Sequence, residues 1–144
     1  VWSIIRPAGQ APYRRSRLSS NVRPQMQRQR DAVEIGVGGR RVSLPWPTLQ
    51  VVATDGVTIA LLDPDAYLQD PEYKAARRAG APAIKNLWAF SPTGEKLWES
   101  QLPEASDYYY KVVSLVPLAV LSFSSWRCVI SLTTGEIREK EFFK

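Results

Sequence analysis

The sequence contains no histidine, a single cysteine and a single methionine. Without histidine the chain has no Ser-His or Cys-His pair, and it lacks the commonest general base and zinc ligand. Cys128 has no partner for an internal disulfide and lies within an apolar strand pattern. We therefore expect a buried thiol in a reducing compartment, and a protein that is not an enzyme and holds no metal or cofactor.

Long apolar runs are also missing. No stretch approaches the roughly 20 residues that cross a bilayer. The apolar residues 1–5 are followed by Arg6 and Pro7, which does not fit a signal peptide. The sequence therefore predicts a soluble, cytoplasmic protein that does not enter a membrane.

Positive charge is concentrated at the N-terminal end. Residues 1–41 hold nine arginines and two acidic residues, a net charge of +7, so of the total of +5 the remainder of the chain carries −2. Residues 1–31 are rich in Arg, Pro, Ser and Gln and show no strand or helix period, so we predict a disordered basic arm. The arm is interpreted as a solvated tail or as a nucleic-acid-binding segment. Whether residues 1–25 belong to the native protein stays open, because the sequence starts at Val1 and its methionine is Met26.

Residues 32–144 are predicted to form one mainly β domain of antiparallel meanders. Apolar and polar residues alternate on both sides of the Gly38-Gly39 and Asp55-Gly56 turns, which is typical of hairpins. After these come a hairpin around Thr93-Gly94 and a meander that contains Thr134-Gly135. The strands group into two four-stranded units: 49–53, 57–62, 87–90 and 96–99, followed by 111–115, 118–123, 127–132 and 136–141.

A helical insertion at about residues 64–85 interrupts the first unit. Asp70 is the predicted N-cap of one short helix with Pro71 at its first position. Asp63 and Asp65 belong to a turn in this interpretation. These three aspartates lack the alternation and the glycine of a calcium loop, so turn and cap roles account for them and no metal site is predicted.

The segment 87–99, Leu-Trp-Ala-Phe-Ser-Pro-Thr-Gly-Glu-Lys-Leu-Trp-Glu, resembles the repeat of quinoprotein-type (PQQ-like) β-propeller blades. The resemblance implies a blade-like hairpin and identifies no quinone ligands. Two such units do not close a propeller ring. We therefore expect two blade-like sheets packed as a small sandwich or an open barrel. Residues 61–144 also resemble small bacterial β-rich proteins to which no activity is assigned.

Two groups of side chains are candidate binding residues. Tyr108 and Tyr110 alternate with Tyr109 along a predicted strand. They are interpreted either as core residues or as part of a partner-binding face. The second group belongs to the insertion and is either a binding surface or a solvated cover over a sheet edge: Tyr73, Lys74, Arg77, Arg78 and Lys85.

The leading hypothesis is a non-enzymatic module that binds another protein through the insertion and the neighbouring tyrosines. Immunity proteins that neutralise toxins are the analogy for a small β protein of this kind. The alternatives are a nucleic-acid binder that uses residues 1–31 and a carboxylate-dependent hydrolase with an acidic cleft. The sequence identifies neither the partner nor the oligomeric state.

Overall fold

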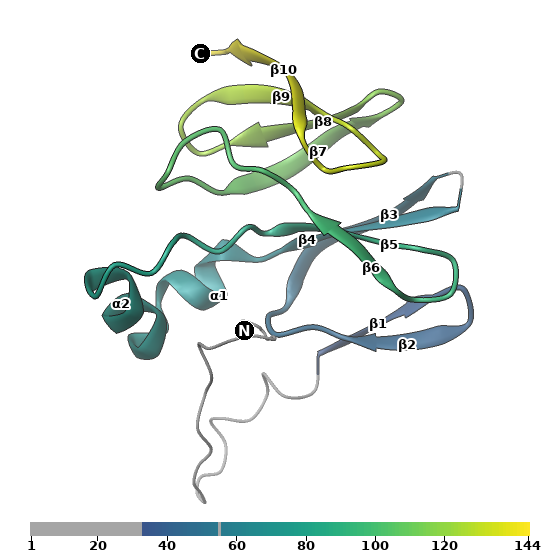
Figure 1. The fold of residues 1–144 in the computed structure, drawn as a ribbon, viewed down its shortest axis with the longest axis horizontal. Coiled ribbons are helices and arrows are strands. Elements are labelled where there is room, and N and C mark those ends of the chain that lie inside the picture. The colour runs from purple at the N-terminus through teal and green to yellow at the C-terminus, as the bar shows by residue number, and fades with distance from the viewer. Residues whose placement is uncertain (1–32, 55) are drawn as a thin grey trace, which may run out of the picture.

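The computed structural model of the protein describes residues 33–54 and 56–144, so the predicted basic arm at 1–31 lies outside the described residues. Within them the protein is mainly β (Figure 1). The elements in chain order are β1 (Glu34–Val37), β2 (Arg40–Ser43), β3 (Thr48–Thr54), β4 (Val57–Leu62), α1 (Pro64–Leu68), α2 (Pro71–Arg78), β5 (Leu87–Phe90), β6 (Lys96–Glu99), β7 (Tyr109–Leu115), β8 (Leu118–Ser122), β9 (Trp126–Ile130) and β10 (Ile137–Phe142).

The two predicted four-stranded units are confirmed as two antiparallel sheets. The first sheet has the order β3-β4-β5-β6, and the second has the order β10-β9-β8-β7, so each is a meander of consecutive strands. Strands β1 and β2 form a separate hairpin across a turn in which Gly38 and Gly39 both have positive φ. The described strands form separate open sheets and no closed barrel, which agrees with the prediction of two blade-like units packed as a small sandwich or an open barrel.

The main core lies between the two sheets, which are stacked in Figure 1. The first sheet contributes Ile59, Leu61 and Leu87, and the second contributes Tyr109 and Val120, all with 0 % exposure. The predicted burial of the cysteine is confirmed, because Cys128 is also fully buried in this core. Full burial of such side chains stabilises the fold by about 1.5–3 kcal/mol each.

Polar side chains also join the two sheets. The Asn86 amide is fully buried and donates to the carbonyl oxygens of Leu62 at 2.9 Å and Tyr109 at 2.8 Å, and its oxygen accepts from the Tyr109 N–H at 3.0 Å. At the other end, Trp98 Nε1 donates to the Leu132 carbonyl oxygen at 2.9 Å, and the indole lies against Gly135. These contacts fix how the second sheet sits on the first.

The opposite face of the first sheet is covered by the β1–β2 hairpin and by the helices, which lie on the side away from the second sheet in Figure 1. A second core forms there, in which Val37 and Tyr67 pack against Ala60 and Leu62 of β4. Residues 59–62 are all fully buried. Strand β4 is therefore buried on both faces, which explains its nearly continuous apolar sequence.

The outer face of the second sheet carries charged residues. Lys111, Leu121 and Arg127 are neighbours across β7, β8 and β9, and Glu141 of β10 pairs with Arg127 in the same row. Lys111 and Glu141 are exposed. Charged side chains on this face favour contact with water over packing against another sheet.

The insertion contains the predicted helix and one further helix. Asp70 caps α2 as predicted, with its Oδ2 accepting from the Tyr73 N–H at 3.0 Å. The turn prediction at residues 63–65 is wrong, because Asp63 caps the five-residue helix α1 through a 2.9 Å bond from the Asp65 N–H to its Oδ1. The reason is the Asp-Pro pair: a cap followed by Pro64 starts a helix as well as a turn.

Candidate binding cleft between the insertion and the second sheet

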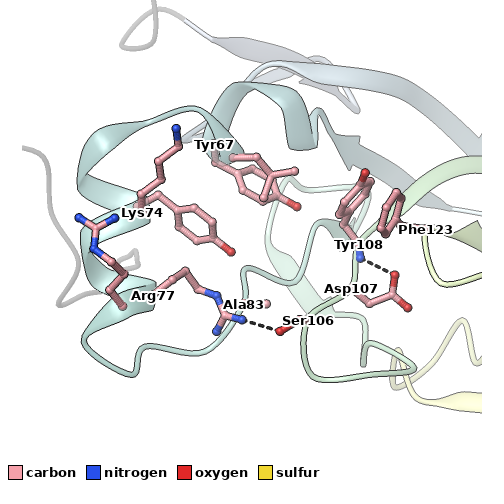
Figure 2. A pocket seen from close by; sticks show the side chains of 11 residues that line it. Tyr67, Lys74, Arg77, Ala83, Ser106, Asp107, Tyr108 and Phe123 are labelled. Atoms are coloured by element: carbon pink, nitrogen blue, oxygen red, sulfur yellow. Dashed lines mark hydrogen bonds between the residues drawn. The ribbon is translucent and has the colours of Figure 1, made fainter.

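A cleft of about 370 Å³ opens between the helical insertion and the second sheet, and we call it the insertion cleft (Figure 2). Its walls come from three segments that are distant in sequence: the two helices with the chain that follows them, the loop before β7, and the β8–β9 turn. Its lining residues are Tyr67, Leu68, Tyr73, Lys74, Arg77, Arg78, Ala83, Ser106, Asp107, Tyr108 and Phe123. The volume lies in the usual range of ligand sites.

Helix α2 supplies the basic side chains of the cleft. The cap at Asp70 fixes the start of the helix, and the spacing of four residues places Tyr73 and Arg77 on one side and Lys74 and Arg78 on the adjacent side. The Arg77 guanidinium is held in place, because Nη1 donates to the Ala81 carbonyl oxygen at 2.6 Å. Its Nη2 donates to Ser106 Oγ at 2.8 Å, so Arg77 joins the insertion to the loop before β7 (Figure 2).

Two tyrosines form the inner wall of the cleft. The rings of Tyr67 and Tyr73 meet edge to face with centroids 5.1 Å apart. Tyr73 Oη accepts a 3.2 Å hydrogen bond from the Ile84 N–H. Tyr67 is 1 % exposed, and its hydroxyl has no hydrogen-bond partner in the described part of the chain. Burial raises the pKa of both phenols, so both keep their protons at neutral pH.

The opposite wall is an aromatic pair held by an aspartate. Tyr108 and Phe123 are stacked, with ring centroids 5.0 Å apart and an interplanar angle of 20°. Asp107 is buried, and its Oδ1 accepts from the backbone N–H groups of Tyr108 at 2.8 Å and Ser124 at 3.1 Å. The aspartate thereby fixes the loop before β7 to the β8–β9 turn, and it presents Tyr108 and Phe123 together.

The structure brings most of the predicted binding residues to this cleft. Tyr73, Lys74, Arg77, Arg78 and Tyr108 all line it. Lys85 is exposed outside its lining, and so is Tyr110, which follows the buried Tyr109 on β7 and therefore points to the opposite face of the strand. Tyr109 is in the core instead, where its hydroxyl donates to the Gln101 carbonyl oxygen at 2.6 Å.

Several lining residues were not identified from the sequence. Tyr67 was missed because α1 is too short to show a helical period. Asp107 and Ser106 belong to a connection of polar residues that carries no periodic signal. Phe123 follows a buried strand, and the apolar sequence pattern does not show that 64 % of its surface is exposed. The one available signal was the cluster of aromatic residues around Tyr108.

Among residues 33–54 and 56–144, no three His, Cys, Asp or Glu side chains gather closely enough to hold a metal ion. In that same part of the chain, neither helix has the length and apolar character to span a bilayer.

The chain belongs to the family described as a domain of unknown function (DUF7957), whose model matches residues 26–142. The match includes every helix and strand described above. No curated protein and no solved structure is significantly similar to the chain.

Proposed function

We propose that the protein is a non-enzymatic binding module whose partner is another protein, and that the insertion cleft is the contact surface. The observation that carries this proposal is the composition of the cleft: three basic side chains of α2 stand beside aromatic rings, and one of these, Phe123, is 64 % exposed. Exposed aromatic residues beside arginine are typical of protein interfaces. We place this binding in the cytoplasm, since a lone buried thiol suits a reducing compartment.

The chemistry of the cleft supports binding over catalysis. Asp107 is the one carboxylate in the lining that the structure describes; its Oδ1 is bonded to two backbone N–H groups, and its buried Oδ2 has no hydrogen-bond partner in the described part of the chain. Hydrolysis by a carboxylate pair needs a second acid about 5–10 Å away in the same cleft. The tyrosine hydroxyls keep their protons, so they act as hydrogen-bond donors and not as bases.

The proposal is tested by capture from the source cell with the tagged full chain and two matched variants. The rim variant carries Lys74→Glu and Arg78→Glu. The control variant carries Lys111→Glu and Arg127→Glu, which make the same charge change on the outer face of the second sheet. We expect one protein partner to be recovered with the wild type and the control variant and lost with the rim variant.

Recovery of the same proteins with the rim variant would contradict a role for the cleft. A chain that begins at Met26 tests the alternative function. Nucleic acid that is recovered only with the full chain, and that is released by raising the salt concentration, would assign the activity to the arginine-rich residues 1–31.

A further inference from the structure

The lining of the insertion cleft contains more positively than negatively charged side chains. Lys74 and Arg78 are exposed, and neither forms an ion pair within residues 33–54 and 56–144. The Arg77 guanidinium bonds to a carbonyl oxygen and a hydroxyl, both uncharged. Asp107, the one described acid in the lining, stands against three cations. A complementary occupant is therefore negatively charged.

The wall formed by Tyr108 and Phe123 offers an apolar contact surface next to the positively charged side chains. Phe123 keeps 64 % of its surface exposed although one face of its ring is stacked on Tyr108. A large exposed ring beside a cleft is typical of a binding surface, and a second aromatic ring packed on such a ring gains about 0.5–1.5 kcal/mol beyond the area that it buries. The occupant therefore carries an aromatic side chain close to its negative charge.

The inner wall adds a hydrogen-bond donor. The Tyr67 hydroxyl is buried and has no acceptor in the described part of the chain, and Figure 2 shows it on the side of the ring that faces Tyr108. A buried polar group without a partner costs about 1–3 kcal/mol. A carboxylate oxygen that reaches the inner wall would accept this bond, so the occupant gains from an acid that enters the cleft.

On these grounds we propose that the insertion cleft binds an extended segment of the partner protein in which glutamate or aspartate flanks an aromatic residue. The aromatic ring packs on Phe123, and the carboxylates meet Lys74, Arg78 and the Tyr67 hydroxyl. A volume of about 370 Å³ suits the side chains of a short segment. Residues 1–31 of this chain do not meet these requirements, because their arginines have the same sign as the rim.

This inference rests on the proposed function and is tested separately with synthetic peptides. The probe is a fluorescently labelled peptide with two glutamates on each side of a phenylalanine, and its binding to the full chain is followed by fluorescence anisotropy at low salt. We expect the dissociation constant to rise at least tenfold with the rim variant, which corresponds to about 1.4 kcal/mol. The control variant is expected to bind like the wild type.

Two changes separate the contributions. Replacing the phenylalanine of the peptide by alanine is expected to weaken binding severalfold. In the protein, Tyr67→Phe keeps the ring and removes only the hydroxyl, so it should weaken binding of the glutamate peptide severalfold without lowering the melting temperature. A peptide with lysine in place of glutamate should not bind.

The inference is overturned if the rim and control variants bind the acidic peptide equally, or if the lysine peptide binds as well. It is also overturned if sedimentation shows a dimer of the protein that the rim variant abolishes while no peptide binds, because the occupant is then a second copy. If the capture experiment gives a rim-dependent partner but every acidic peptide fails, this inference falls and the proposed function stands.

Discussion

Gly135 is a position where the structure predicts a large effect of adding one methyl group. It lies in the turn between β9 and β10 with φ of +79°. A Cβ atom built there would lie 2.6 Å from Cε3, 2.7 Å from Cδ2 and 2.9 Å from Cγ of Trp98 in the first sheet. Carbon atoms in contact are normally about 3.5–4.0 Å apart, so in the Gly135→Ala variant the Trp98 indole must move away by about 1 Å.

Trp98 has little room to retreat. It is 7 % exposed, its ring packs in the core between the sheets, and its Nε1 donates to the Leu132 carbonyl oxygen. Overpacking of this kind costs about 1–3 kcal/mol. Weakening the indole hydrogen bond adds about 0.5–1.5 kcal/mol. Alanine at positive φ costs a further 1–2 kcal/mol or so, independently of Trp98.

Gly39→Ala isolates the backbone cost. Gly39 has φ of +83°, and a Cβ atom there would meet nothing within 4 Å. In urea unfolding followed by tryptophan fluorescence, we expect Gly39→Ala to lower the free energy of unfolding by about 1–2 kcal/mol. Gly135→Ala should lower it by about 2–4 kcal/mol more, a large part of the stability of a domain of this size. Equal losses in the two variants would refute the argument that Trp98 leaves no space at Gly135.

Two further predictions concern buried polar groups. Asn86→Ala removes three hydrogen bonds of a fully buried amide, two of which join the sheets, so we expect a loss of about 3 kcal/mol or more in urea unfolding. Ser114→Ala, which removes one exposed bond, should cost less than about 1 kcal/mol, and similar losses in both would contradict the role of Asn86. Burial raises the pKa of Tyr67 and Tyr109, so the folded state keeps protons that the unfolded state releases above about pH 10. The contribution of these tyrosines to the free energy of unfolding should therefore be full below about pH 10 and fall above it by up to about 1.4 kcal/mol per pH unit for each tyrosine. The fall should be shallower in Tyr67→Phe, and an identical fall in that variant would contradict a contribution from Tyr67.

The strands were predictable because their signals are local. The Gly-Gly and Thr-Gly turns carry the positive φ that tight connections need, and the apolar runs between them identify the strands. Helix α2 was predictable for the same reason, since Asp70 and Pro71 mark its start. The five-residue helix α1 was missed because it is shorter than two helical turns, so no periodicity distinguishes it from a turn.

The second role of the Thr-Gly turns was not predictable. Gly94 and Gly135 occupy equivalent places in the two units, and both have positive φ. Gly94 lies beside Val42 and Arg40 of the hairpin, whereas Gly135 lies under the indole of the other sheet. The sequence signal is the same in both turns, and the difference arises only when the sheets stack.

The cleft was partly predictable for a related reason. The basic residues of α2 are neighbours in sequence, so helical spacing was enough to place them together. Phe123 and Asp107 reach the same cleft only because Asp107 bonds across to the β8–β9 turn. That contact is between side chain and backbone 17 residues apart, and one sequence contains no signal for it.

The position of the cleft follows from what covers the outer face of each sheet. The outer face of the second sheet is not covered by another element of the described chain, and charged residues such as Lys111 and Glu141 are exposed to water there. The outer face of the first sheet is covered by the hairpin and by the insertion, which buries Tyr67 and Tyr73 against it. The insertion extends beyond the sheet that it covers, and Arg77 bonds to Ser106 in the loop that leads into β7. The cleft is therefore formed where the cover of one sheet meets the first strand of the other, which explains why its basic and aromatic walls come from different units.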